Sequence, residues 1–356
     1  MVRRPRAMPL MPEFSQLQQS IALLYAVVMT IAACTGAGGG VTTSPPSPAP
    51  SLGATAFPSL AATASPTLAP AFPTTVTDDE GTVVEIAVEP DVIVSLTPAT
   101  TETLFALGLG DRIVGKGQDF FLYPPEAGSI PDVATFDKVD IEKIVSLAPD
   151  VVFAGGNFFT PPDAVQRMRD LGLTVVVLYA PSVDAVFRDI EVIGQAAGRP
   201  AEARAIVDRV RSEFDAVETA VSGLPRPRLF YELDATGAIY GPADDSFLAE
   251  MIVLAGGDPI TTGSAHKFDI SVERLIEQDP ELILLADAPF GVTAQQVGAR
   301  PGWDVMTAVK TRRILPIDDQ TVTRPGPRLF LGLRLLAGTI HPDVALPSTE
   351  PIPPMP

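Results

Sequence analysis

Continuous runs of apolar residues, each about as long as a β-strand, recur along the chain. They lie at Val92–Leu96, Val151–Ala154, Thr174–Leu178, Arg228–Tyr231, Glu281–Leu285 and Arg313–Ile317. Strands that are apolar on both faces are typical of parallel sheets covered by helices. The segments between these runs have a helical period, so the pattern predicts an α/β fold with largely parallel sheets.

Two stretches of the chain, 131 positions apart, share one pattern of apolar, polar and proline positions. They are Val139–Phe153 and Ile270–Leu284, and each predicts a short amphipathic helix, a proline and a buried strand. Upstream, Leu107–Ile113 matches Leu254–Ile260. The match predicts two pseudo-equivalent lobes with a cleft between them. It also places Glu142 and Glu273 at the same position near a helix start.

Two helical segments lie between the two repeats. Apolar residues at three- and four-residue steps predict helices at 183–197 and 201–221. The second, about 21 residues long, would span roughly 30 Å. We therefore expect an N-terminal lobe at 74–181, inter-lobe helices at 182–223 with a single long helix joining the lobes, and a C-terminal lobe at 224–343.

The N-terminus has the pattern of a signal peptide. Three arginines precede an uncharged apolar run, Ile21–Ala33, which ends at Cys34. The run is shorter than the roughly 20 residues that a membrane-spanning helix needs, which disfavours a transmembrane anchor. Ile31–Cys34 resembles a bacterial lipobox, which implies that residues 1–33 are removed and that Cys34 carries a lipid. A cysteine that is lost with the cleaved peptide is the alternative.

Composition divides the rest of the chain. Residues 34–73 are rich in Pro, Ser, Thr and Ala and predict a linker, and 344–356 predict a disordered proline-rich tail. Cys34 is the only cysteine, so no intramolecular disulfide can form. The formal net charge of −18 would repel phosphate backbones, which argues against nucleic-acid binding.

Residues 74–343 resemble the substrate-binding lipoproteins of ABC importers, in the class that handles cobalamin, ferric siderophores and haem. The likeness rests on Val76–Gly81, Ile93–Gly108, Tyr123–Ala127, Ser246–Gly257, Pro301–Trp303 and Arg324–Leu329. The resemblance implies the fold of class III periplasmic binding proteins. It also implies a monomer outside the cytoplasm, anchored to the membrane by the lipid on Cys34.

In that family an acidic residue on each lobe pairs with arginines of the permease. Glu142 and Glu273 fall on the matching positions, so the resemblance implies that they dock onto ABC permease subunits. The alternative role is that each glutamate only stabilises the N-terminus of its helix through the helix dipole.

Aromatic residues concentrate in the predicted loops at the lobe edges. They are Phe120, Phe121, Tyr123, Phe136, Phe158, Phe159, Tyr240 and Phe268, with His266 nearby. Flat apolar faces suit a large ring system or an aromatic chelate. We expect Phe120, Tyr123, Phe136, Tyr240 and Phe268 to contact the ligand, a corrinoid or ferric chelate. We expect Arg324, rather than Arg328, to counter its negative charge.

Several alternatives remain open from the sequence. Haem iron requires an axial ligand, for which Tyr240, Tyr123 and His266 are candidates. A receptor for bare zinc or manganese is disfavoured because His266 and His341 are the only histidines. The sequence contains no Gly-x-Ser-x-Gly, Walker or His-Glu-x-x-His motif that would indicate an enzyme. We also expect no cofactor or resident metal. A cell-surface sensor or adhesive protein of the same fold, without transport, is a third class.

Overall fold

The computed structural model describes residues 72–135, 138–156 and 159–349. The predicted signal peptide, Cys34, nearly all of the linker and Phe136 lie outside these residues. Within them, no helix is both long enough and apolar enough to cross a membrane.

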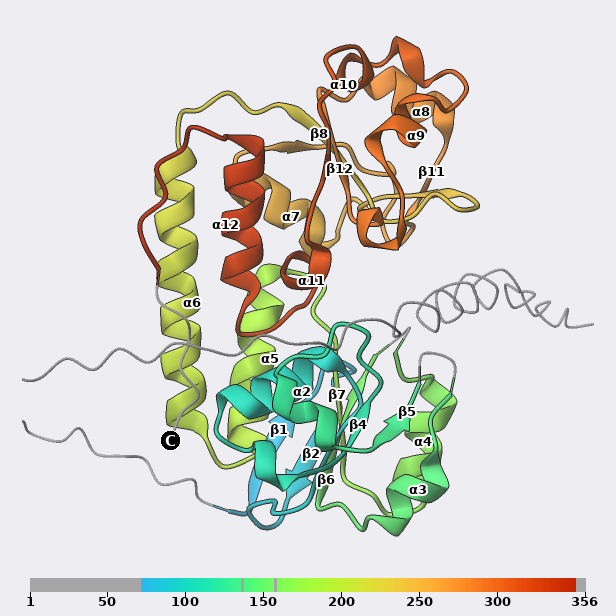
Figure 1. The fold of residues 1–356 in the computed structure, drawn as a ribbon. Coiled ribbons are helices and arrows are strands. Elements are labelled where there is room, and N and C mark those ends of the chain that lie inside the picture. Colours follow the sequence, from blue (N-terminus) through green and yellow to red (C-terminus); the bar gives the residue numbers. More distant parts are fainter. Residues whose placement is uncertain (1–71, 136–137, 157–158, 350–356) are drawn as a thin grey trace, which may run out of the picture. The chain divides into compact units, whose positions relative to one another are not determined.

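The N-terminal lobe is built on a five-stranded parallel sheet with the order β5-β4-β3-β6-β7 (Figure 1). Its strands are β3 (Ile93–Ser95), β4 (Ile113–Gly117), β5 (Asp132–Ala134), β6 (Val151–Gly155) and β7 (Val175–Leu178). The helices are α2 (Pro98–Ala106), α3 (Ile141–Ser146) and α4 (Pro162–Asp170). An antiparallel hairpin, β1 (Thr74–Thr77) and β2 (Val83–Ile86), precedes them.

The C-terminal lobe contains a four-stranded parallel sheet with the order β10-β8-β12-β13. Its strands are β8 (Arg228–Glu232), β10 (Asp258–Pro259), β12 (Leu282–Leu285) and β13 (Ile314–Pro316). A separate antiparallel pair joins β9 (Ile239–Tyr240) to β11 (Asp269–Ile270). The helices are α7 (Phe247–Leu254), α8 (Val272–Gln278), α9 (Ala294–Gly298), α10 (Thr307–Lys310), α11 (Asp319–Val322) and α12 (Leu329–Ile340).

The two lobes repeat one another as the sequence pattern predicts. The unit α3–β6 in the first lobe corresponds to α8–β12 in the second. Asp140 caps α3 by accepting a hydrogen bond from the Lys143 amide, and Ser271 caps α8 in the same way at Arg274. Each helix is followed by a left-handed residue ahead of proline, Ala148 with φ 47° and Asp279 with φ 44°. The equivalence therefore extends to the backbone conformation.

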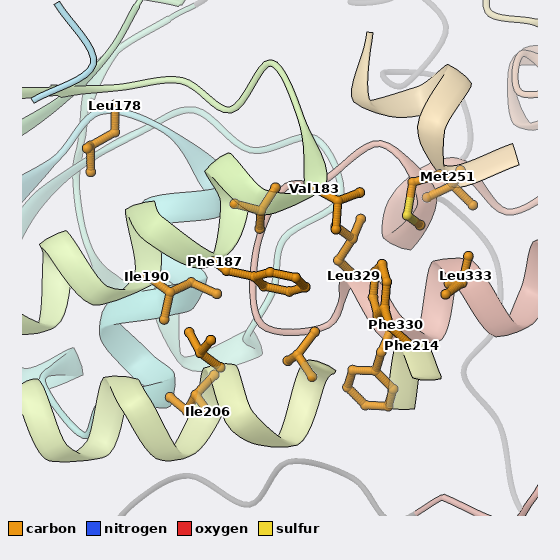
Figure 2. Close-up of a cluster of buried hydrophobic side chains, with 14 of the residues drawn as sticks. Leu178, Val183, Phe187, Ile190, Ile206, Phe214, Met251, Leu329, Phe330 and Leu333 are labelled. Carbon is orange, nitrogen blue, oxygen red and sulfur yellow. The ribbon is translucent and has the colours of Figure 1, made fainter. Parts of the chain in front are cut away.

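Two helices lie between the lobes in the chain, α5 (Val183–Ala196) and α6 (Pro200–Val221). The longer one, α6, leads into the C-terminal lobe and is the longest helix in the described residues. One hydrophobic core runs through both lobes along these helices. Figure 2 shows Phe187 of α5, Phe214 of α6 and Phe330 of α12 in this core. The Phe187 and Phe214 rings meet edge to face at 5.6 Å. A helical connection with a shared core opposes bending between the lobes.

The strands β3, β6, β7 and β12 of the two parallel sheets are buried on both faces, which explains the continuous apolar runs. Alternate residues of β12 face different cores: Leu282 and Leu284 belong to the shared core, whereas Ile283 and Leu285 face a second core within the C-terminal lobe. In β6, Val152 and Ala154 likewise face a separate N-terminal core. The α/β fold with parallel sheets is thus confirmed.

The C-terminal segment differs from the expected disordered tail. Val344 and Leu346 pack against the shared core, and the Thr349 hydroxyl donates to Glu213 of α6 at 2.5 Å. Arg334 also donates to the carbonyl of Pro347. A tail beginning at residue 344 is therefore wrong: apolar residues between the prolines let this segment pack against α6 and α12 as far as residue 349.

Candidate functional site

A depression lies at the carboxyl edge of the N-terminal sheet. It is lined by Leu96, Pro98, Gly117, Gln118, Ala134, Thr135 and Phe159, which follow or end the strands β3 to β6. Ligands of open α/β sheets bind outside the carboxyl ends of the strands. None of these lining side chains carries a charge, so the depression suits an apolar or amide-bearing surface.

Two glycines give this depression its form. A Cβ atom at Gly117 would lie 2.4 Å from the Leu96 carbonyl oxygen, so only glycine lets β4 approach the end of β3. A Cβ at Gly155 would lie 2.6 Å from both the Phe159 Cβ and the Thr97 methyl group. Glycine at position 155 therefore lets Phe159, which is 46% exposed, lie close to the end of β6.

The loop after β4, residues 118–123, contacts the C-terminal lobe; we call it the aromatic loop. Its Phe121 ring lies 6.0 Å from the ring of Phe290, which follows β12. Its Tyr123 ring is stacked by the Arg328 guanidinium at 3.3 Å from the ring centroid. Phe120, which precedes Phe121 in the sequence, is half-buried. The structure thus brings the predicted residues Phe120 and Tyr123 to the junction of the lobes.

Two arginines of the C-terminal lobe pair with carboxylates of the N-terminal lobe; we call Glu102, Asp119, Arg324 and Arg328 the inter-lobe bridge. Arg324 binds Asp119 through two parallel hydrogen bonds of 2.9 and 2.8 Å. Arg328 donates to Glu102 at 2.8 Å through its side chain and at 3.1 Å through its amide.

This arrangement bears on the role expected for Arg324. Its side chain is only 10% exposed, and a second carboxylate, Glu102, lies 3.8 Å away. The positive charge of Arg324 is therefore already balanced by carboxylates of the protein.

The C-terminal lobe brings Tyr240 and Phe268 together. Tyr240 pairs with Asp269 in the β9–β11 ladder, and the Gly241 amide donates to the Phe268 carbonyl at 2.8 Å. Both side chains are half-buried. His266, nearby, is almost fully exposed and its Nδ1 lies 2.9 Å from Asp245.

A buried charged cluster occupies the carboxyl ends of β8 and β12. Arg300 binds the fully buried Glu232 carboxylate through two hydrogen bonds, of 2.5 and 2.8 Å, and stacks over Trp303. Asp287 is 4% exposed, and both its carboxylate oxygens are buried without a hydrogen-bond partner in the described residues. Burial, and secondly the negative charge of Glu232, raise the pKa of Asp287 to about 7.

Glu142 and Glu273 occupy the first turns of α3 and α8, as the repeat predicts, and both are exposed. Exposure at equivalent positions makes both available to a partner protein. Among the described residues, no group of three or more His, Cys, Asp or Glu side chains is arranged to hold a metal ion.

Sequence reasoning missed Phe290 and Gln118. The repeat holds a signal for Phe290, because the spacing of 131 positions relates it to Phe159. The two phenylalanines follow the equivalent strands β6 and β12, one in each lobe. Gln118 has no such signal, since its place in the depression depends on how β4 and β5 pair.

Comparisons with known proteins agree with this architecture. Residues 93–321 match the family model described as periplasmic binding protein. The chain is 33% identical over 277 residues to the uncharacterized ABC transporter substrate-binding lipoprotein YvrC of Bacillus subtilis, covering 76% of this chain and 87% of that protein. It is 28% identical to a cobalamin-binding protein of Halobacterium salinarum, covering 76% and 75%. The solved structure of the periplasmic heme-binding protein RhuT from Roseiflexus superposes with a TM-score of 0.63 at 26% identity, covering 71% and 98%.

Proposed function

Because the chain belongs to the periplasmic binding protein family, as a substrate-binding component of an ABC importer rather than an enzyme, we propose that it captures a corrinoid or a ferric chelate. The ligand lies between the lobes, against the depression and the aromatic loop. The protein then delivers it to a membrane permease.

The observation that carries this proposal is the set of aromatic side chains at the lobe edges, Phe121 against Phe290 and Tyr123 against Arg328, with Phe159 exposed at the rim of the small uncharged depression. A corrinoid offers a broad ring with amide side chains, which complements apolar walls and the amide of Gln118. Arg324 and Arg328 already have carboxylate partners, which disfavours a ligand with several negative charges. The relative named a cobalamin-binding protein supports the same ligand class.

Haem is the second candidate. The structural likeness to a heme-binding protein and the position of Tyr240 beside Phe268 favour it, because haem iron can take tyrosine as an axial ligand. His266 favours it less, since this side chain is exposed to solvent and pairs with Asp245.

Delivery requires contact with a permease, for which Glu142 and Glu273 are the proposed docking residues. They lie at equivalent positions on the two lobes, so a two-fold permease would meet both in the same way. Attachment to the membrane is proposed to occur through a lipid on Cys34, as in the relative named a lipoprotein.

Fluorescence titration tests the ligand proposal. Trp303 is the only tryptophan in the chain and is buried in the C-terminal lobe, so its emission reports a bound chromophore. Cyanocobalamin, cobinamide, haem and a ferric hydroxamate are each titrated into the mature chain. We expect saturable quenching by a corrinoid or a ferric chelate. Saturable quenching by haem alone supports the second candidate, and binding of a free metal ion or an amino acid with none of these refutes the proposal.

A further inference from the structure

The aromatic loop is held in place by a residue of the other lobe. Within the loop, the Phe121 amide donates to Asp119 Oδ1 at 3.0 Å. From the C-terminal lobe, Arg324 Nη2 donates to the Phe121 carbonyl at 3.1 Å and also to Asp119 Oδ1 at 2.8 Å. Both polar groups of the Phe121 backbone are therefore tied to the Asp119–Arg324 pair.

The geometry of Arg324 matches this role better than ligand binding. Arg324 Nη1 donates a hydrogen bond to Asp119 Oδ2 at 2.9 Å, while Nη2 donates to Asp119 Oδ1 and to the Phe121 carbonyl. Asp119 and Arg324 are almost fully buried, with side chains 7% and 10% exposed. A planar guanidinium that binds one carboxylate with two hydrogen bonds has a fixed orientation, so it also fixes whatever else it contacts.

We propose that Arg324 is a positioning residue: acting through Asp119, it fixes the backbone of the aromatic loop from the opposite lobe and so orients Phe120 and Phe121 for the ligand. This inference rests on the proposed function only in assigning those rings to the ligand. The contact between Phe121 and Phe290 supports it, since the loop meets the C-terminal lobe through the ring as well as through the backbone.

Positioning and direct charge pairing predict different effects of Asp119→Asn. If Arg324 countered a ligand anion, removing the Asp119 charge would leave more positive charge for the ligand and would strengthen binding of haem, which carries two carboxylates. If Arg324 positions the loop, Asp119→Asn weakens binding as Arg324→Ala does, and the loss is similar for neutral cyanocobalamin and for haem. In addition, the double variant is no worse than either single one, because both changes break one unit.

The test combines affinity with hydrogen exchange in the mature chain. Arg324→Ala, Asp119→Asn, Arg324→Lys and the double variant are titrated with cyanocobalamin and with haem. Arg204→Ala, an exposed charge change on α6, is the matched control. We expect each single change to weaken binding about 10- to 100-fold, the range for losing hydrogen bonds to charged groups. Arg324→Lys should behave like Arg324→Ala, because an ammonium keeps the charge but loses the planar arrangement of donors.

Hydrogen exchange in the ligand-free chain tests the same idea without a ligand. The peptide covering residues 118–123 should exchange faster in Arg324→Ala and in Asp119→Asn, to the same extent, while peptides from α6 stay unchanged. Unchanged exchange in this peptide overturns the proposal, as do tighter haem binding by Asp119→Asn or additive losses in the double variant. If the wild-type chain binds none of cyanocobalamin, cobinamide, haem and a ferric hydroxamate while the exchange result holds, the proposed function fails and the positioning of the loop stands.

Discussion

At the scale of single residues, burial at the edge of the C-terminal sheet raises the pKa of Asp287. Its pKa is raised from an ordinary value of 3.8 to about 7, so between these pH values the folded chain holds a proton that the unfolded chain has lost. Its contribution to stability is therefore largest below about pH 4 and falls as the pH rises towards 7.

Replacing Asp287 by asparagine should remove this loss. We expect Asp287→Asn to stabilise the fold at pH 8 by about 1–3 kcal/mol, because a neutral amide replaces a carboxylate whose ionisation is opposed by burial and by Glu232, and to have little effect at pH 4. Chemical denaturation at both pH values measures this, with the exposed Asp304→Asn as control. Equal changes in the free energy of unfolding at the two pH values would contradict a raised pKa of Asp287.

The phenylalanines at the equivalent turns give a prediction about binding. Phe159→Ala and Phe290→Ala should each weaken ligand binding by about 1–3 kcal/mol, within the range for losing a packed aromatic face. Leu171→Ala removes a side chain that is 55% exposed on the turn after α4, and it serves as the control. Isothermal titration of each variant with the ligand that quenches Trp303 measures the effect. Wild-type affinity in both phenylalanine variants would remove these turns from the site.

At the scale of elements, the repeat made most of the fold predictable. The continuous apolar runs predicted the central strands, because these parallel strands are buried on both faces in the described lobes. The period of residues 183–221 gave α5 and α6 with ends within one residue of those observed. Local pattern was sufficient there, since each element depends on its own sequence.

The contacts between lobes could not be predicted in the same way. Asp119 and Arg324 are far apart in the sequence, and nothing in either segment signals a partner. Arg324 therefore looked like a free charge for a ligand. Likewise, the packing of Val344 and Leu346 depends on the surface that α6 and α12 form together, which a local pattern cannot show.

The equivalent helices α3 and α8 lead to a prediction about transport. Glu142→Ala combined with Glu273→Ala should lower uptake at least about tenfold and leave ligand affinity within a few fold, because exposed charges act on partner recognition more than on folding. Uptake of labelled ligand by cells measures this, and Glu191→Ala with Glu218→Ala on α5 and α6 is the matched control. Parallel loss of ligand binding would assign the two glutamates to the fold or the ligand site. Uptake that does not need the protein at all would favour a sensor.

At the scale of the whole molecule, the proposed attachment to the membrane depends on one residue, Cys34, outside the described part of the chain. Cys34→Ser should release the protein from the membrane fraction with the folded lobes intact, because the chain has no other cysteine to acylate. Fractionation with mass spectrometry of the N-terminus measures this. A variant that stays membrane-bound with residues 1–33 uncleaved would instead indicate a transmembrane anchor.

The central claim is that the two lobes hold a corrinoid or a ferric chelate, and the absorption spectrum of the protein tests it most directly. A chain that begins at residue 34 is incubated with cyanocobalamin, cobinamide, haem and ferric siderophores in turn. It is then separated from free ligand by gel filtration, and its visible spectrum is recorded. Each of these ligands is coloured. The account predicts that the protein retains the spectrum of a corrinoid or a ferric chelate, with one chromophore per chain. A protein that emerges colourless from every incubation would contradict it.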